Sequence, residues 1–252
     1  MSAKTRDRLL YLISPIALLL IWELLLRNGI GDLRFIPAPS DIALRFWQLT
    51  VNGELAAHTL ATVARAAAGF VIGVVPAIAI GLAMAMWRPV RIFFDPLIAA
   101  LFPIPKVALM PLVLLAFGFG DASKIAVVAL AVFFPVIVNT YAGAANIDKI
   151  YWDVARNYGA SQYVMFTRIV FFGALPTIFA GLRIALAVSF IVLVAAEFVA
   201  TKAGIGYLIW NSWELLQVDV MFVGIVTIGF LGLATAVIFQ ELENKVIPWK
   251  KN

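Results

Sequence analysis

The sequence of 252 residues contains no cysteine and only one histidine, His58. The absence of cysteine excludes a disulfide framework, a thiolate nucleophile and a cysteine-based metal site, and one histidine cannot build a His-rich metal cluster. No P-loop pattern, the glycine-rich signature that cradles nucleotide phosphates, occurs along the chain. We therefore expect no catalytic group, no metal and no cofactor on this chain.

Charged residues are also scarce, at 13% of the chain, about half of the roughly 25% usual in soluble domains. Hydrophobic residues instead reach 63%. A soluble domain of this size cannot bury so many apolar side chains in one core. The composition therefore excludes an ordinary soluble enzyme, a disordered chain and a nucleic-acid-binding module, and it indicates an integral membrane protein.

The apolar residues fall into long, charge-poor windows. A bilayer core about 30 Å thick needs about 20 apolar residues of helix, and six windows of about this length occur. Their continuous apolar character favours helices over the alternating strands of a barrel. The first window is expected to be a retained helix, because no small-residue cleavage site of a signal peptide follows it. We predict an all-α membrane protein with one domain, residues 1–252, and six transmembrane helices at about 9–26, 59–86, 93–117, 125–145, 174–200 and 220–239.

The distribution of lysine and arginine predicts the orientation of these spans. Six crossings place both termini on one side, and that side collects 11 of the 19 Lys and Arg residues, whereas the opposite loops hold four, including Lys124. Cytoplasmic loops are the ones enriched in these residues. Both termini are therefore expected in the cytoplasm, and the net charge of +5 reflects topology rather than nucleic-acid binding.

The loop after the first span begins with two prolines, in the segment 35–41. Ser40 or Asp41 is expected to cap a short amphipathic helix that carries Ile42, Phe46 and Leu49 on its apolar face. This helix is either an element at the outer membrane surface or a spacer between spans.

The third span is interrupted by Pro103, Pro105 and Pro111, each of which lacks a backbone N–H. Non-helical backbone at membrane depth is tolerated where protein or a water-filled cavity satisfies it, and broken helices often line a pathway. Lys106 lies within this break. It is interpreted either as a residue of the pathway or as a side chain that extends to a nearby membrane interface.

The most distinctive stretch is the polar segment 146–172. Asp148 is expected to cap a helix that runs to Tyr158, with Gly159 ending it in the left-handed conformation and Ser161 capping a second helix. Such a helix–glycine–helix unit with exposed aromatic residues suits docking into a groove on a partner protein. A helix that merely lies in the membrane interface would show the same pattern.

Three charges are expected within spans and isolated there, each without a charged partner: Glu23, Arg183 and Glu197. Arg183 is interpreted either as a positive element for an anionic substrate or as a contact to lipid phosphate. Glu197 is expected to orient the following loop, residues 201–213, rather than touch substrate. His58 stands alone at a span boundary, and interfacial hydrogen bonding is its expected role.

The segment 146–172 also contains a recognisable spacing. Asp153-Val154-Ala155 is followed by Gly159, Ile169 and Phe171-Phe172. This spacing resembles the signature of the permease subunits of bacterial ABC importers in the sulfonate, nitrate and taurine group, which reads Glu-Ala-Ala, three residues, Gly, nine residues, Ile, one residue, Leu-Pro. Val154 replaces an alanine and Phe171-Phe172 replace Leu-Pro. Further segments are similar to this group: 35–40, 102–112, 117–124, 133–139, 173–176, 181–185, 195–197 and 204–207.

The resemblance implies the type I ABC importer permease fold with a cytoplasmic coupling loop at 146–172. Two copies of the chain, expected as a homodimer, would form the pore in the lipid of the bacterial inner membrane. Two ATP-binding cassette subunits would bind ATP and Mg²⁺, and a periplasmic binding protein would deliver a small, anionic solute. The residues implied in ATPase coupling are Asp153, Ala155, Arg156, Gly159, Ala160 and Ile169, and those implied in the pathway are Pro103, Pro105, Lys106, Arg183 and Glu197.

Two other functions stay open from the residues alone. Glu23 and Glu197 within spans are compatible with an ion-coupled secondary transporter. A non-transporting membrane anchor would give no role to the proline-broken third span. The substrate is not fixed by the sequence: sulfonate, taurine, nitrate, bicarbonate, an aromatic carboxylate and a vitamin precursor all fit.

Overall fold

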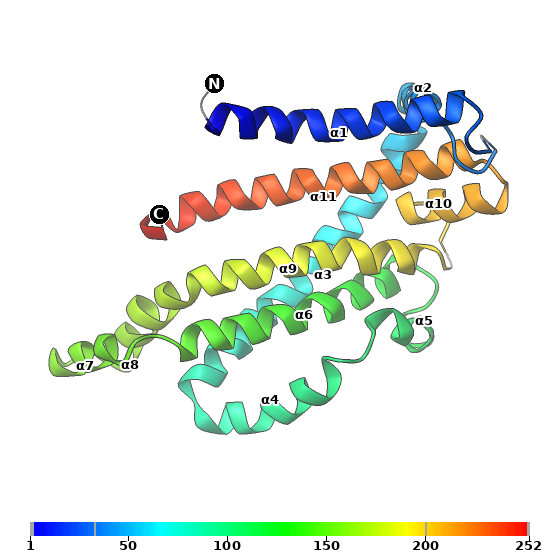
Figure 1. Cartoon of the computed structure of the whole chain (residues 1–252). Helices are drawn as coiled ribbons and strands as arrows, with labels where there is room; N and C mark the ends of the chain where they lie inside the picture. Colours follow the sequence, from blue (N-terminus) through cyan, green and yellow to red (C-terminus); the bar gives the residue numbers. More distant parts are fainter. Residues whose placement is uncertain (1–2, 33, 200, 251–252) are drawn as a thin grey trace.

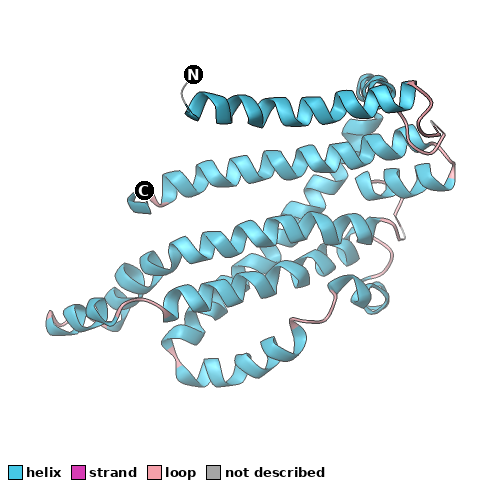
Figure 2. Cartoon of the chain, in the orientation of Figure 1, coloured by secondary structure: helices cyan, strands magenta, loops and turns pink. Residues whose placement is uncertain are grey.

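The computed structural model of the chain describes residues 3–32, 34–199 and 201–250, and every element within these ranges is a helix (Figure 2). The all-α prediction is therefore confirmed. The α-helices are α1 (Ala3–Arg27), α2 (Pro39–Val51), α3 (Glu54–Met86), α4 (Arg88–Leu101), α5 (Met110–Phe117), α6 (Asp121–Ala145), α7 (Lys149–Asn157), α8 (Gln162–Val164), α9 (Phe171–Glu197), α10 (Ile205–Glu214) and α11 (Val218–Val246). The 3₁₀ helices are η1 (Lys106–Leu109) and η3 (Pro248–Lys250), and η2 (Met165–Val170) is a π-helix.

Four helices in the described ranges are long and apolar enough to cross a membrane: α3, α6, the continuous run Gln162–Glu197 and α11. The pair formed by α4 and the η1–α5 segment meets the same criterion only when taken together, and it is bent by 91°. Helix α1 contains the first predicted span, 9–26. The structure thus supports a multi-pass membrane protein, and the count of six crossings stays a prediction.

The core of the bundle is α6, which packs between α3 and α9. Two glycines allow this close approach: a Cβ added at Gly69 of α3 would lie 2.7 Å from the Cβ of Val128, and one at Gly181 of α9 would lie 2.6 Å from the Cβ of Asn139. Both partners belong to α6. Small residues let membrane helices pack through their backbones, which is the principal attractive contact available in lipid.

The two ends of the bundle differ (Figure 1). The two chain termini and the α7–α8 unit lie at one end, here called the α7 end. Helices α2, α5 and α10, together with the loops that join α5 to α6 and α9 to α10, lie at the opposite end, here called the α10 end. This arrangement agrees with the predicted topology, in which the termini share a side with the segment 146–172.

The predicted third span, 93–117, is broken as its prolines indicated. Helix α4 ends at Leu101, and the backbone resumes a 3₁₀ turn at Lys106. The predicted fifth span, 174–200, falls mostly within a longer helix that runs without interruption from Gln162 through the π-helix to Glu197, and its predicted end at residue 200 lies outside the described residues. Gly173 lies inside this helix and gives room to Ile147, whose Cδ1 would lie 2.8 Å from an added Cβ.

Two local predictions are wrong. Helix α2 begins at Pro39 with Ala38 as its N-cap and no side-chain cap, so neither Ser40 nor Asp41 caps it; Ser40 N–H instead donates to Glu23 Oε2 at 3.0 Å. The predicted apolar face of α2 is confirmed, since Ile42 and Leu49 are buried. Lys124, predicted in a loop, lies in α6 and is fully buried, because α6 starts at Asp121.

Candidate functional site

The segment 146–172 forms a projecting unit at the α7 end of the bundle (Figure 1). Asp148 Oδ1 accepts a hydrogen bond from Ile150 N–H at 3.0 Å and caps α7, as predicted. Ser161 Oγ accepts from Val164 N–H at 3.3 Å and caps α8, which is also predicted. Side-chain oxygens at these positions satisfy N–H groups that the first helical turn leaves free.

Four of the residues implied in ATPase coupling form the turn between α7 and α8. Gly159 has φ of +69°, in the left-handed region that favours glycine. Ala160 N–H donates to Ala155 C=O at 2.9 Å, and Gly159 N–H donates to Arg156 C=O at 3.0 Å. These two bonds form a Schellman motif, the usual way to end a helix on a left-handed glycine. Ala155, Arg156, Gly159 and Ala160 therefore define the sharp turn that carries α7 back toward α9.

Helix α7 has no buried residue among its nine. Tyr151 and Tyr158 are 61% and 88% exposed, and Ile150 and Val154 are exposed beside them. Asp153 and Arg156 are also exposed, whereas Trp152 is partly buried against the main core and anchors the helix. Exposed aromatic and aliphatic side chains on a short, well-capped helix are typical of a protein-docking surface.

Ile169 lies apart from this turn, within the π-helix. It lines a pocket of about 380 Å³ between the segment 146–172 and the C-terminal end of the chain. Trp249 also lines this pocket, and its ring packs against that of Phe172 with centroids 5.9 Å apart. Ile169 thus contributes to the base that supports α7 rather than to its exposed face.

Lys106 holds the break between α4 and η1 together. Its Nζ donates to the carbonyls of Leu101 at 2.7 Å, Ile104 at 2.8 Å and Phe102 at 3.2 Å, and lies 4.2 Å from the ring centre of Phe134. Because Pro105 has no N–H, the Leu101 carbonyl four residues before it lacks its usual helical donor. Lys106 supplies it.

Arg183 and Glu197 are not isolated, in contrast to the prediction. Arg183 of α9 forms an ion pair with Glu243 of α11. Glu23 is paired as well, with Arg27 at 3.0 Å. The five residues proposed for a pathway are therefore not brought together: Pro103, Pro105 and Lys106 form the α4–η1 link, Arg183 faces α11, and Glu197 belongs to a cluster at the α10 end.

The sequence analysis did not predict the cluster of residues that surrounds Glu197. Arg65 Nη1 of α3 donates to Glu197 Oε1 at 2.7 Å, although 132 positions separate the two residues. Thr62 Oγ1 donates to Glu197 Oε2 at 2.9 Å, and Gly206 N–H donates to the same oxygen at 2.9 Å. Arg65 and Glu197 lie in two different apolar windows of the sequence. Because charges at membrane depth tend to pair, their opposite signs could have indicated this contact.

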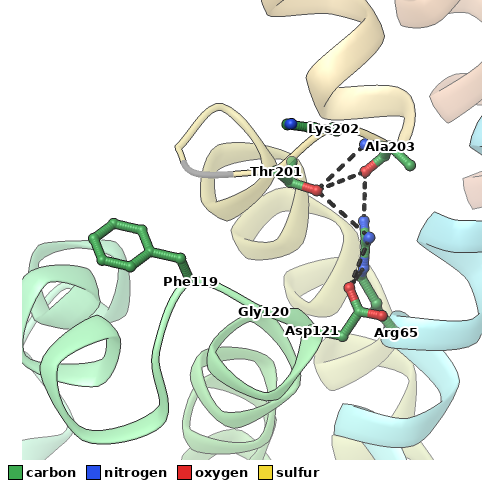
Figure 3. Close-up of a pocket in the computed structure, with 7 residues that line it drawn as sticks. All are labelled: Arg65, Phe119, Gly120, Asp121, Thr201, Lys202 and Ala203. Atoms are coloured by element: carbon green, nitrogen blue, oxygen red, sulfur yellow. Dashed lines mark hydrogen bonds and ion pairs between the residues drawn. The ribbon is translucent and has the colours of Figure 1, made fainter.

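Glu197 does orient the loop that follows it, as expected. Besides binding Gly206 N–H, it faces Gly204, where an added Cβ would collide with the carboxylate. Arg65 Nη1 also donates to Ala203 C=O at 2.7 Å (Figure 3). His58 Nδ1 accepts from Gly204 N–H at 3.1 Å, which agrees with the hydrogen-bonding role expected of this histidine.

The chain is similar to known transport proteins over most of its length. The family described as "Binding-protein-dependent transport system inner membrane component" matches residues 77–248. The putative aliphatic sulfonates transport permease protein SsuC of Escherichia coli (strain K12) is 37% identical over 93% of this chain and 89% of its own length. SsuC of Bacillus subtilis (strain 168) is 31% identical over 96% and 87%, and the taurine transport system permease protein TauC of Escherichia coli (strain K12) is 31% identical over 92% and 86%.

These matches extend across the helical core, the segment 146–172 and the cluster around Glu197. They account for an apolar helical bundle with a projecting, capped helix at one end. The chain belongs to the family of binding-protein-dependent transport system inner membrane components, and it is the transmembrane permease subunit of an ABC transporter.

Proposed function

We propose that the chain forms one half of the pore of an ATP-driven importer for a small organic anion of the sulfonate or taurine type. The observation that carries the proposal is that relatives named for aliphatic sulfonates and taurine match more than nine-tenths of the chain. Two copies, assembled as a homodimer in the lipid of the inner membrane, enclose the pathway.

Coupling to ATP hydrolysis takes place at α7. A peripheral ATP-binding cassette subunit, which holds ATP and Mg²⁺, binds exposed side chains of α7 and of the turn that follows it, among them Tyr151, Asp153 and Tyr158. The rigid turn at Gly159 and the continuous helix from Gln162 to Glu197 carry the movement of this subunit into the membrane. The uninterrupted backbone supports this role, because a continuous helix transmits displacement over its whole length.

The α7 end and both termini then face the cytoplasm, and the α10 end faces the binding protein that delivers the substrate. The excess of Lys and Arg on the side of the termini supports this orientation. The short helix α10 and the loops around it supply the surface to which the substrate-loaded binding protein docks.

An ion-coupled secondary transporter is disfavoured by the environment of its two candidate carboxylates. Glu23 is paired with Arg27, and Glu197 is fully buried and held by Arg65, Thr62 and Gly206 N–H. A carboxylate that binds and releases a coupling ion must exchange its partners in each cycle, and a buried ion pair opposes that exchange.

The substrate and the partners are tested in one experiment. The permease, the ATPase and the binding protein are co-expressed in a strain that lacks sulfonate uptake, and the accumulation of labelled ethanesulfonate, taurine, nitrate and an aromatic carboxylate is compared. We expect accumulation of ethanesulfonate or taurine, and co-purification of the ATPase with the tagged permease. Deletion of residues 153–159 should abolish co-purification. Accumulation of nitrate alone would contradict the substrate class, and ATPase retained by the deletion variant would contradict the role of α7.

A further inference from the structure

An open pocket of about 540 Å³ lies at the α10 end, between the start of α6 and the loop that joins α9 to α10 (Figure 3). Its volume falls within the roughly 300–1,000 Å³ typical of sites for small molecules. Arg65 forms the floor, and Phe119, Asp121, Thr201 and Lys202 surround it. The pocket is on the side opposite α7, where the proposed function places substrate delivery.

The charges around this pocket favour an anion. Arg65 and the buried Lys124 interact electrostatically with Asp121 and Glu197, so that two positive groups face two negative ones. Lys202, which is exposed at the mouth, adds a further positive charge. The pocket therefore carries one excess positive charge, and a carboxylate that moved aside would leave two.

The two carboxylates on Arg65 differ in how firmly they are held. Glu197 is fully buried and accepts hydrogen bonds from Thr62 and Gly206 N–H as well as from Arg65. Asp121 has a side chain that is 67% exposed and accepts from Arg65 Nε at 2.8 Å. Removing Glu197 from Arg65 would leave a buried charge without its partner, whereas Asp121 can turn into water at little cost. Asp121 is the exchangeable partner of Arg65.

We propose that this pocket binds the sulfonate group of the substrate, which takes the place of Asp121 on Arg65. The guanidinium edge formed by Nε and Nη2 offers two parallel donors, the arrangement that suits two oxygens of one anionic group. The ammonium group of the exposed Lys202 supplies a further donor at the mouth. Phe119, whose side chain is 75% exposed on the opposite wall, covers the short organic tail.

This inference rests on the proposed function for its ligand class, and its test measures binding rather than transport. The purified permease–ATPase complex in detergent, without the binding protein, is titrated with sodium ethanesulfonate in an isothermal calorimeter. Asp121→Asn removes the competing negative charge with little change in shape, so we expect about three- to tenfold tighter binding than in the wild type. Lys202→Glu should weaken binding by a similar factor.

Asp32→Asn is the matched control. Asp32 is also paired with an arginine, Arg34, and lies in the loop between α1 and α2 at the same end of the bundle. The hydrogen bonds from Arg34 lower the pKa of Asp32 to about 2, so this substitution also removes a full negative charge at neutral pH. Because Asp32 does not line the pocket, the affinity for ethanesulfonate should equal that of the wild type.

Equal affinities in Asp121→Asn and Asp32→Asn, or an unchanged affinity in Lys202→Glu, would overturn the proposal. Absence of saturable binding in all variants would overturn it as well. These outcomes are separate from failure of the proposed function. If the transporter accumulates another solute while Asp121→Asn still tightens ethanesulfonate binding, the substrate class is wrong and the anion pocket is right. If ethanesulfonate is accumulated but no variant alters its binding, the pocket is wrong and the function is right.

Discussion

At the scale of single residues, the pair of Arg65 and Glu197 is the most consequential contact in the bundle. Both side chains are buried, and together they join α3, α9 and the loop before α10. Removing one member of a buried ion pair leaves an uncompensated charge, which costs about 3–5 kcal/mol. The sequence placed the two residues in different apolar windows, and only tertiary packing could show that they meet.

We predict that Arg65→Gln lowers the free energy of unfolding by about 3 kcal/mol, the cost of leaving the Glu197 charge unpaired. The double variant Arg65→Gln with Glu197→Gln should lose less than the sum of the two single variants, because neither retains an unpaired charge. The measurement is SDS-induced unfolding in mixed micelles. Arg34→Gln, at a side chain that is 83% exposed, serves as the control and should change stability little. Additive losses in the double variant would refute the coupling.

Gly159 provides the second prediction at this scale. Nothing lies within 4 Å of a Cβ added at this position, so any effect of substitution comes from the left-handed backbone and not from a clash. Gly159→Val should weaken binding of the ATPase about tenfold, because a left-handed residue with a Cβ costs about 1–2 kcal/mol. Gly159→Asn should weaken it less, since asparagine tolerates this conformation. The affinity is measured by titrating the purified ATPase onto the permease in nanodiscs. Equal affinities for both variants would contradict the claim that ATPase binding depends on the left-handed backbone at Gly159.

At the scale of the elements, features that depend on neighbouring residues in the chain could be predicted from the sequence, whereas contacts between distant residues could not. The caps at Asp148 and Ser161 and the turn at Gly159 depend on neighbours in the chain, so the sequence predicted them correctly. The prolines predicted a broken third span, but the donor that stabilises the break, Lys106, acts through space. Gly173 is a point of close approach to Ile147, a contact that no local sequence pattern indicates.

The π-helix at Met165–Val170 gives a prediction at the element scale. A π-turn holds one residue more than an α-turn, so deletion of Thr167 should convert it to α-helix while both flanks keep their positions. We expect the deletion variant to fold, with a melting temperature close to that of the wild type in detergent. Deletion of Ala187, which lies in the α-helix α9, should prevent folding. It rotates all later residues of the helix by about 100° and so moves Glu197 away from Arg65. If both deletions unfold the protein, the π-helix does not absorb the change.

At the scale of the whole molecule, the composition predicted a membrane protein, and the different elements at the two ends of the bundle distinguish its two sides. The termini and α7 lie at one end, and α10 and the pocket above Arg65 lie at the other (Figure 1). The all-helical membrane fold could be predicted from apolar windows because lipid leaves few alternatives to helices. The number of crossings stays a prediction, because the two helical segments that would form the third span meet at an angle of 91°.

The orientation can be tested by labelling single introduced cysteines, because the chain has no cysteine of its own that would have to be replaced first. In intact cells, a cysteine introduced at Asn157, in the exposed C-terminal turn of α7, should resist a membrane-impermeant maleimide and react only after lysis. A cysteine at the exposed Lys202 should react before lysis. A cysteine at Ala77, which is fully buried in α3, serves as the unreactive control. The reverse pattern at Asn157 and Lys202 would invert the proposed topology.

The central claim is that ATP hydrolysis by a partner, transmitted through α7, drives uptake by this chain. The most direct measurement is uptake of labelled ethanesulfonate into proteoliposomes that contain the permease–ATPase complex, with ATP enclosed and the binding protein outside. We predict uptake that requires ATP, persists when an ionophore dissipates all ion gradients, and disappears when residues 153–159 are deleted. Uptake that occurs without ATP and collapses with the ionophore would contradict the account.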